Sequence, residues 1–301
     1  MPGQPLMGVQ VTGATGFVGR ALVAALRRAP ARLFLPRELN LALGMDPGIS
    51  TVIHLAARVH VMKDDASDPL MAFRAINVDA TLNLAAQAAS AGVRRFVFLS
   101  SVKVNGEATA VGRPFTERDT PSPHDPYAQS KWEAEQGLRH IAANTGMEVV
   151  IIRPPLVYGP GVKANFAALV RAVVRGWPLP LGAVNNMRSL VALDNLVDFT
   201  MTCATHPAAA NQTFLVSDGH DLSTPDLIRA IARAAGVRPH LFPVPLSALQ
   251  FFGRVSGKGA AVERLCGNLQ LDTSKARELL GWVAPVGVDE ALRRSFARGP
   301  I

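Results

Sequence analysis

Short apolar segments alternate with longer segments of mixed character along the first half of the chain. Segment 51–56 (TVIHLA) is almost continuously apolar, which is typical of a strand buried in a parallel sheet. Segment 66–91 instead spaces its apolar residues as an amphipathic helix does. The expected strands are 9–12, 32–36, 51–56, 95–99 and 148–153, and the expected helices are 20–28, 66–91 and 127–145. This alternation predicts an α/β fold with a Rossmann-type, doubly wound parallel sheet.

Beyond residue 160 the alternation loosens. The segments that still show a regular pattern are the helical stretches 166–175, 194–205 and 224–235 and the short strand 213–216. We expect a dinucleotide-binding domain over 1–160, completed by strands that return from later segments, and a smaller mixed substrate lobe over 161–301. The apolar run 246–252 allows two interpretations, contact with a membrane surface or packing of a C-terminal helix, and the second is favoured. No apolar run approaches the ~20 residues that span a bilayer.

Composition narrows the class of function. Hydrophobic residues make up 49% and charged residues 18% of the 301 positions, as in a globular protein. The net charge is +8, but the arginines are scattered, so a basic site for an anionic small molecule is favoured over nucleic-acid binding. The two cysteines, Cys203 and Cys266, lack metal-ligand spacing, which favours a reducing cytoplasm and no metal site.

Three glycines follow the first expected strand. Gly13 suits the tight turn off the strand, Gly16 lets a pyrophosphate approach the backbone, and Gly19 lets the next helix pack closely on the strand. The N–H groups and the dipole of that helix would then face the phosphates. The stretch therefore predicts a dinucleotide site.

The adenine side of the expected sheet is short. Only about twenty residues separate Ala31 from Thr51, whereas a full β-α-β unit needs ~30 or more. Arg37 follows the second expected strand and could meet the 2′-phosphate of NADP, whereas its neighbour Glu38 could bind the ribose hydroxyls of NAD.

Ser101, Tyr127 and Lys131 are the candidate catalytic residues. Ser101 follows an expected strand, and ligands of such sheets lie at the carboxyl ends of the strands. Tyr127 and Lys131 share a helix face, and we expect the lysine to lower the phenol pKa from about 10. Tyr127 could then exchange a proton with a substrate oxygen that Ser101 holds.

Several motifs together resemble those of the extended short-chain dehydrogenase/reductases. Their sequences are TGATGFVG at 12–19, HLAA at 54–57, Asn77, LSS at 99–101, YAQSK at 127–131 and RPPLVYGP at 153–160. The chain is similar to the nucleotide-sugar epimerase/dehydratase branch of that family. The resemblance implies a nucleotide-sugar lobe after residue 160, NAD(P)(H) as cofactor, and a homodimer through the helices near 72–88 and 127–145.

The resemblance also implies residue roles. Ser101, Tyr127 and Lys131 form the catalytic set, and Lys131 also holds the nicotinamide ribose. The implied cofactor contacts beyond the three glycines, Arg37, Tyr127 and Lys131 are Thr15, Phe17, Val18, Leu55, Ala56, Ala57, Asn77 and Pro154. The buried-strand residue His54 and also Asn77 are interpreted as positioning rather than catalytic residues.

Substrate residues follow from the same resemblance. Arg188 matches a family arginine that meets the nucleotide diphosphate, and Asn165, Arg264 and Lys103 are weaker candidates for the substrate site. The 4,6-dehydratases have an acidic pair after the strand-end residue. Here Val102 and Lys103 stand at those positions, which disfavours loss of water.

With loss of water disfavoured, the reaction that the resemblance still implies is hydride transfer at the C4 carbon of the sugar. The run SSVKVNGE at 100–107 resembles a subgroup of bacterial O-antigen enzymes that reduce UDP-4-keto-6-deoxy-N-acetylhexosamines, many of which are loosely called UDP-glucose 4-epimerases. The resemblance implies a reductase of UDP-4-keto-6-deoxy-hexoses or hexosamines in O-antigen synthesis. The short adenine side suits the exchange of cofactor that a reductase needs, with NADP(H) slightly favoured. The alternative is a UDP-glucose or UDP-N-acetylglucosamine 4-epimerase that keeps its NAD. A non-catalytic NAD(P)-binding sensor is a remote third possibility.

Overall fold

A parallel sheet of six strands forms the centre of the computed structural model, which describes residues 6, 8–35, 45–46, 48–59, 68–257 and 259–297. The strands, in spatial order, are β2 (Arg32–Phe34), β1 (Gly8–Thr12), β3 (Thr51–His54), β4 (Arg95–Leu99), β5 (Glu148–Arg153) and β8 (Thr213–Leu215). The order reverses between β1 and β3, the position at which doubly wound sheets bind their ligands. The predicted fold class is confirmed.

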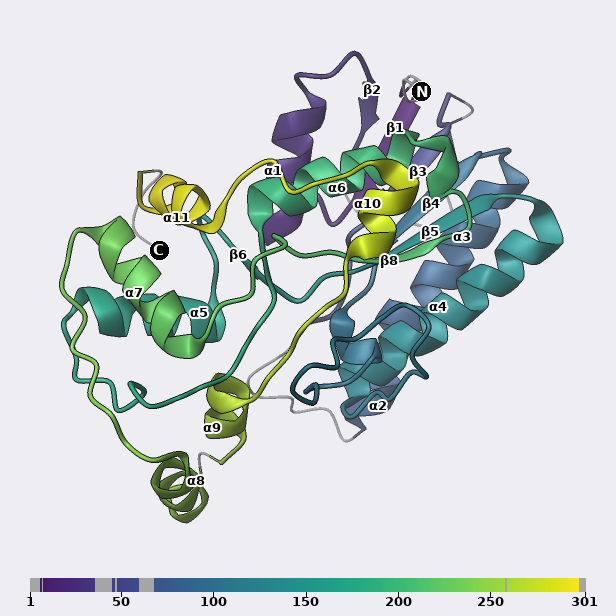
Figure 1. Ribbon diagram of the computed structural model, residues 1–301. Coiled ribbons are helices and arrows are strands. Elements are labelled where there is room, and N and C mark those ends of the chain that lie inside the picture. Colours follow the sequence, from purple (N-terminus) through teal and green to yellow (C-terminus); the bar gives the residue numbers. More distant parts are fainter. Residues whose placement is uncertain are drawn as a thin grey trace.

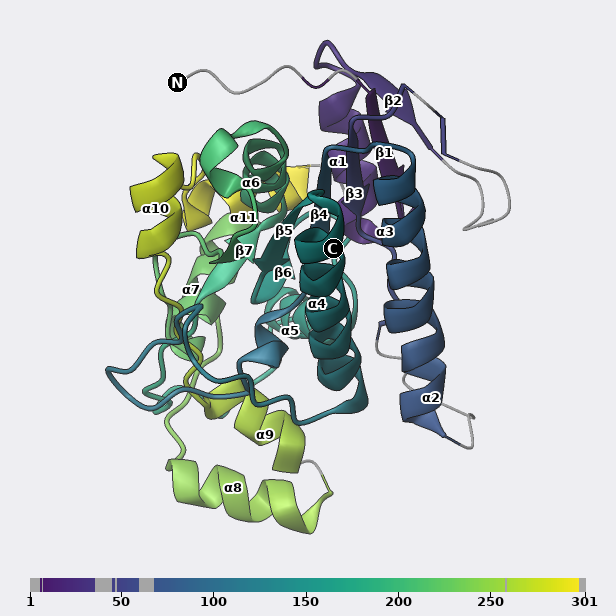
Figure 2. The same cartoon turned by 90° about the vertical axis from the view of Figure 1, so that its right-hand side faces the viewer.

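Helices cover both faces of the sheet (Figure 1). One face packs against α1 (Phe17–Leu26) and α6 (Leu193–Thr205), and the other packs against α3 (Ala80–Ser90) and α4 (Pro126–Thr145). Figure 2 shows β4 and β5 between α6 and α4. Strands enclosed on both faces are mostly apolar, and the polar residues of β3, Thr51 and His54, are buried with its Val52 and Ile53.

The predicted long helix over 66–91 is divided. It consists of α2 (Pro69–Arg74), a π-helical turn η1 (Ala75–Asp79) and α3. Asp68 caps α2, because its carboxylate accepts the Met71 N–H at 3.1 Å, and residue 69 is proline, which is favoured at a first helical position. The hydrophobic spacing did not predict the wider turn.

A second helical group lies beside the sheet. It contains α5 (Ala164–Val174), α7 (Thr224–Ala235) and α11 (Val288–Ala297), which share one apolar core. The short strands β6 (Leu156–Tyr158) and β7 (Leu190–Ala192) pair in parallel. Beyond them α8 (Leu246–Val255) and α9 (Gly259–Cys266) form a hairpin at the bottom of Figure 1.

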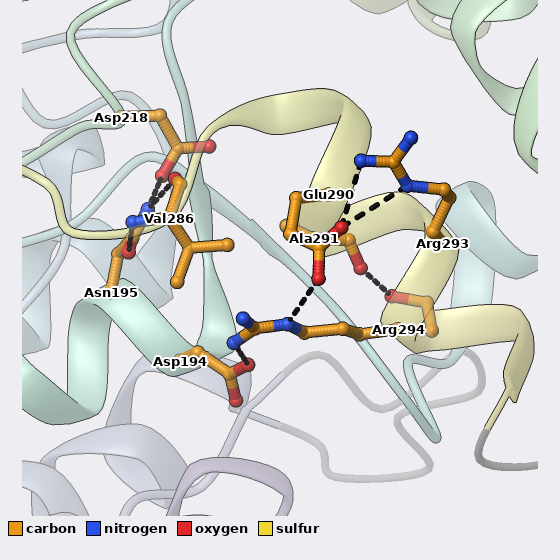
Figure 3. A network of polar contacts seen from close by, with 9 residues as sticks. Asp194, Asn195, Asp218, Val286, Glu290, Ala291, Arg293 and Arg294 are labelled. Atoms are coloured by element: carbon orange, nitrogen blue, oxygen red, sulfur yellow. Dashed lines mark hydrogen bonds and ion pairs between the residues drawn. The ribbon is translucent and has the colours of Figure 1, made fainter.

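Polar contacts tie α11 to the start of α6 (Figure 3). The Asn195 side chain donates to the Val286 carbonyl at 2.7 Å and accepts the Val286 N–H at 3.0 Å. It also donates to Asp218 at 2.7 Å, and Arg294 bonds Asp194 at 3.3 Å. The last helix is thereby joined to a helix of the sheet.

Chain segments after residue 160 also complete the sheet. Strand β8 pairs with β5, α6 packs on the sheet, and α10 (Ser274–Leu280) lies against β8, with Lys275 donating to the Thr213 carbonyl at 2.9 Å. On the opposite side β2 is the outermost strand within the described ranges. No helix among the described residues is both long and apolar enough to cross a bilayer.

Candidate active site

The carboxyl ends of four adjacent strands bring the candidate residues together. Gly13 follows β1, Leu55 follows β3, Ser100 follows β4 and Pro154 follows β5. The strand ends are level, since Thr12 lies beside His54 and Leu99 beside Ile152 in the register. Further hydrogen bonds extend this alignment past the strands, with Leu55 N–H donating to the Thr12 carbonyl at 3.2 Å and Val102 N–H to the Pro154 carbonyl at 2.9 Å.

The glycine turn has the geometry expected of it. Gly13 has φ +70°, and a Cβ there would lie 2.6 Å from the backbone nitrogen of Ala56. A Cβ on Gly19 would lie 2.0 Å from the Gly13 carbonyl oxygen, so only glycine allows the helix so close to the strand. Thr15 and Gly16 are exposed, whereas Phe17 and Val18 pack partly against the core.

The turn fits a dinucleotide phosphate. Gly16 is the N-cap of α1, and no side chain in the described part of the chain caps this helix or places an acidic group in its first turn. The first N–H groups of α1 therefore point out of the helix without a competing carboxylate, which is the arrangement that binds anions. Ala56 and Ala57 line the same turn from the loop after β3 and are partly exposed.

Ser101 and Tyr127 meet at the end of β4. Their side chains lie close enough for the Ser101 hydroxyl to influence the Tyr127 phenol, although 26 positions separate the two residues in the chain. Asp125 starts α4 by accepting the Ala128 N–H at 2.7 Å, and this places Tyr127 in the first turn of the helix. The Tyr127 ring also packs edge-on against Phe73 of α2, with ring centroids 6.1 Å apart.

Lys131 lies one turn further along α4 and is buried. Its ammonium donates to the Leu99 carbonyl at 2.9 Å and lies 4.4 Å from the centroid of the Phe98 ring. Burial lowers the pKa of the Lys131 ammonium to about 7, and the nearby Glu135 carboxylate opposes that shift.

The expected direction of the Tyr127 shift is wrong. The pKa of the Tyr127 phenol is raised above its ordinary value, first because the side chain is buried and second because Asp125 is negatively charged. The Ser101 hydroxyl lowers this pKa but does not outweigh burial. Spacing in the sequence predicted the helix face but not the balance between desolvation and charge.

Asn77 is fully buried in the π-helical turn and joins three segments. Its amide group donates to the Arg58 carbonyl at 3.0 Å and to Ser130 Oγ at 2.9 Å, and its oxygen accepts the Arg58 N–H at 2.8 Å. The side chain therefore fixes the loop after β3 against α4. This supports the positioning role rather than a catalytic one.

His54 is likewise a core residue. Its two ring nitrogens hydrogen-bond the hydroxyls of Thr12 at 2.7 Å and Thr81 at 2.9 Å, and the ring stacks on Phe98. Burial, aided by the charge of Lys131, lowers the pKa of His54 to about 3. A neutral imidazole in this place holds β1, β3 and α3 together.

The distal candidates lie in the second lobe. Arg188 is largely buried and donates to the Gly267 carbonyl at 2.9 Å, just after α9. Arg264 is exposed on α9, and Asn165 is exposed in the first turn of α5. Lys103, near Ser101, forms ion pairs with Asp125 and, at 3.3 Å, with Glu107. Arg37 and Glu38 lie outside the described residues.

A buried ionic network beneath the site was not predicted. Glu135, one turn after Lys131, accepts hydrogen bonds from Ser100 at 2.6 Å and from Arg153 at 2.9 Å and 2.5 Å. Arg153 also donates to Asn105 Oδ1 at 2.9 Å. The signal available in the sequence was an arginine at the end of a buried strand, which requires a buried acidic partner.

Comparison with known proteins gives consistent similarities. Residues 9–217 match the model of the NAD dependent epimerase/dehydratase family. A Vibrio cholerae protein named UDP-glucose 4-epimerase is 46% identical, covering 95% of this chain and 94% of its own. The N-acetyl-α-D-glucosaminyl-diphospho-ditrans,octacis-undecaprenol 4-epimerase of Escherichia coli O157:H7 is 30% identical over 83% of this chain and 77% of its own.

The fold has solved counterparts. The structure of RMD from Pseudomonas aeruginosa, complexed with NADPH, superposes with a TM-score of 0.78 and 23% identity, covering 97% of this chain and 99% of that one. At this identity the likeness concerns the fold, including the six-stranded sheet and its flanking helices.

Proposed function

The chain belongs to the NAD dependent epimerase/dehydratase family, a group of NAD(P)-dependent enzymes, and on this premise we propose that it transfers hydride at C4 of a nucleotide-diphosphate sugar. The favoured reaction is reduction of a UDP-4-keto-6-deoxy-hexose or hexosamine during synthesis of a bacterial surface polysaccharide of the O-antigen type. NADP(H) is slightly favoured as the cofactor. The expected homodimer and cytoplasmic location remain predictions.

The contact between Ser101 and Tyr127 carries this proposal. Both side chains end at the carboxyl edge of the sheet, where the glycine turn would hold the dinucleotide phosphates. Bound NAD(P)H supplies the hydride. Gly13, Gly16 and Gly19, the first turn of α1 and the loop at Leu55 would hold its phosphates and ribose, and Lys131 would hold the nicotinamide ribose.

Tyr127 can act as the proton donor in the reductive direction. Burial raises the pKa of the phenol, so Tyr127 Oη carries a proton at neutral pH. It can donate this proton to the C4 oxygen of a keto sugar while Ser101 Oγ hydrogen-bonds the same oxygen. In an oxidative half-reaction Tyr127 would first have to lose that proton.

Dehydration is not proposed, because the turn after Ser101 lacks its acid–base pair. Val102 is buried and apolar, and the Lys103 ammonium is paired with Asp125 and Glu107. Those ion pairs also make Lys103 a weaker candidate for substrate binding. Arg188 remains the proposed diphosphate contact, with Asn165 and Arg264 as further candidates.

The 4-epimerase is the second candidate. The name of the Vibrio cholerae relative, at 46% identity, favours it directly. The same residues would then work twice, with Tyr127 accepting a proton in the first half-reaction and returning it in the second. A sensor without catalysis is disfavoured, since the Ser101 and Tyr127 side chains lie near each other at the strand end.

The test starts from freshly purified protein. Cofactor content is measured after extensive dialysis, and the protein is then supplied with a UDP-4-keto-6-deoxy sugar and NADPH or NADH. A reductase loses its cofactor and oxidises the added dinucleotide. Retained, near-stoichiometric NAD, together with interconversion of UDP-glucose and UDP-galactose, would establish the epimerase instead.

Tyr127→Phe is the matched variant. It removes one hydroxyl and keeps the ring against Phe73, so we expect turnover to fall at least ~10²-fold. Cofactor affinity, measured by fluorescence titration, should stay within about twofold, since the phosphates are held at the glycine turn. Turnover close to that of the unmodified enzyme would remove Tyr127 from the proton-transfer role.

A further inference from the structure

Helix α8 carries an exposed apolar face at the end of the molecule. Phe251, Phe252 and Val255 are 62%, 66% and 72% exposed, and their spacing places them on one side of the helix. The opposite side is the packed one, since Gly253 is buried and a Cβ there would lie 2.7 Å from Val262 of α9. Packing of the helix therefore accounts for one side of α8 only.

The place of α8 in the molecule makes this face accessible. Figures 1 and 2 both show α8 beyond α9, at the end of the second lobe that lies away from the strands. Leu246 at the start of the helix and Phe242 just before it are 41% and 44% exposed. Phe251, Phe252 and Val255 are called here the α8 face.

The sequence around α8 is mainly basic. The segment 227–262 contains no aspartate or glutamate, whereas Arg254 lies on the helix itself and Arg238 and Lys258 flank it in the sequence; the exposed Glu263 follows on α9. Arg254 is exposed. A short helix with exposed aromatic residues and basic neighbours is the combination that lies in the interface of an anionic membrane.

We propose that α8 is a membrane-surface helix that docks the enzyme on an anionic lipid bilayer. Phe251, Phe252 and Val255 enter the interface between headgroups and acyl chains, and Arg254 meets lipid phosphates. At ten residues the helix is too short to span a bilayer, so it lies along the surface. This inference is independent of the proposed reaction, because it uses none of the residues at the strand ends.

Ser101 and Tyr127 lie on other elements than α8, so replacing Phe251, Phe252 or Arg254 leaves the reacting groups unchanged. These variants should therefore turn over a soluble nucleotide sugar, without vesicles, as fast as the unmodified chain.

Vesicle flotation tests the proposal. The full chain is mixed with vesicles of phosphatidylcholine containing about 30% phosphatidylglycerol, and with vesicles of phosphatidylcholine alone. We expect binding to the first, weaker binding to the second, and partial release at high salt. Phe251→Ser combined with Phe252→Ser should weaken binding at least ~10-fold, because it removes the two apolar rings that would enter the bilayer interface. Arg254→Glu should weaken binding to the anionic vesicles alone.

The controls separate docking from misfolding and self-association. Val283→Ser alters another exposed apolar side chain, 68% exposed, and should leave flotation unchanged. Turnover of the soluble substrate should be the same in the unmodified chain, the Phe251/Phe252 double variant, Arg254→Glu and Val283→Ser. The proposal is overturned if the unmodified chain does not float with anionic vesicles, or if the double variant floats equally well. It is also overturned if the double variant changes the oligomeric state, which would assign the α8 face to a second copy.

Discussion

Glu135 shows how one buried carboxylate fixes the catalytic side of the molecule. It is fully buried and receives hydrogen bonds from Ser100 just after β4, Arg153 on β5 and, at 3.1 Å, Arg139 on its own helix. A buried ion pair is stable only when its remaining lone pairs are satisfied, and here they are. The ends of two strands are thus locked to the helix that carries Tyr127 and Lys131.

His54 predicts a specific dependence of stability on pH. Its pKa is about 3 in the folded protein and about 6.5 in the unfolded chain. The unfolded chain therefore binds an extra proton as the pH falls below 6.5, and the free energy of unfolding decreases by up to ~1.4 kcal/mol per pH unit. Between pH 6.5 and 5 the loss from this one residue is about 2 kcal/mol.

The measurement is urea denaturation at several pH values, with His54→Gln as the comparison. The variant keeps a polar side chain for Thr12 and Thr81 but cannot titrate, so its stability should fall less steeply between pH 6.5 and 5. Equal slopes for the two proteins would mean that His54 is protonated in the fold.

At this scale the sequence predicted which residues meet but not their protonation. The strand-end serine and the helical Tyr-x-x-x-Lys spacing predicted that Ser101, Tyr127 and Lys131 lie near one edge of the sheet. The raised Tyr127 pKa depends on burial by Phe73 and on the charge of Asp125. Neither effect can be read from positions in a linear sequence.

Among the elements, the π-helical turn Ala75–Asp79 is the one with a functional consequence. Wide turns of this kind occur often at functional sites. Here the turn presents Asn77 to the loop after β3 and to Ser130 on α4. The turn therefore links the cofactor side of the site to the catalytic helix.

Replacing Asn77 by alanine should lower the free energy of unfolding by about 3 kcal/mol, since it leaves the Arg58 backbone groups and Ser130 without their hydrogen bonds. Chemical denaturation measures this loss. Dinucleotide affinity should fall as well, because the loop at Ala56 loses its support. Gln87→Ala, which removes an exposed hydrogen bond to Asn83 on α3, is the control and should change stability by less than ~0.5 kcal/mol. A similar effect of both variants would contradict the linking role of Asn77.

The strands and helices of the first half were predictable because the strands are continuous apolar runs, whereas the helices space their apolar residues with the helical period. Strands 95–99 and 148–153 were expected with the observed bounds, the ends of the other expected strands and helices of this half shifted by a few residues, and 66–91 was divided. The π-helical turn could not be predicted, because one extra residue in a turn changes the hydrophobic period too little to detect. Capping by Asp125 and Pro126 at α4 is a local signal of the kind that sequences do carry.

The whole molecule exposes α2 and the π-helical turn at one side. Met71 and Ile76 are 62% and 39% exposed there. If these helices form the expected homodimer interface, light scattering after size exclusion should give twice the 32.0 kDa chain mass. Met71→Asp with Ile76→Asp should then produce a monomer, because two charges would be buried in the contact.

The α8 double variant is the matched control for that experiment and should remain dimeric. A monomeric unmodified chain at micromolar concentration would refute the predicted dimer. Sequence reasoning could suggest either surface but could not decide which apolar residues the fold leaves exposed. That choice depends on packing between segments far apart in the chain, as at Gly253 and Val262.

The chain passes repeatedly between the sheet with its flanking helices and the second helical group of α5, α7 and α11. After α5 it returns to the sheet through α6 and β8, leaves again for α7, comes back at α10 and leaves once more at α11. A rotation about a single connection would have to stretch all of these passages at once. Substrate must therefore be enclosed by movements of side chains and short loops rather than by rigid-body rotation of one part relative to the other. A protease that cuts one of these connections would leave the two parts held together by the others.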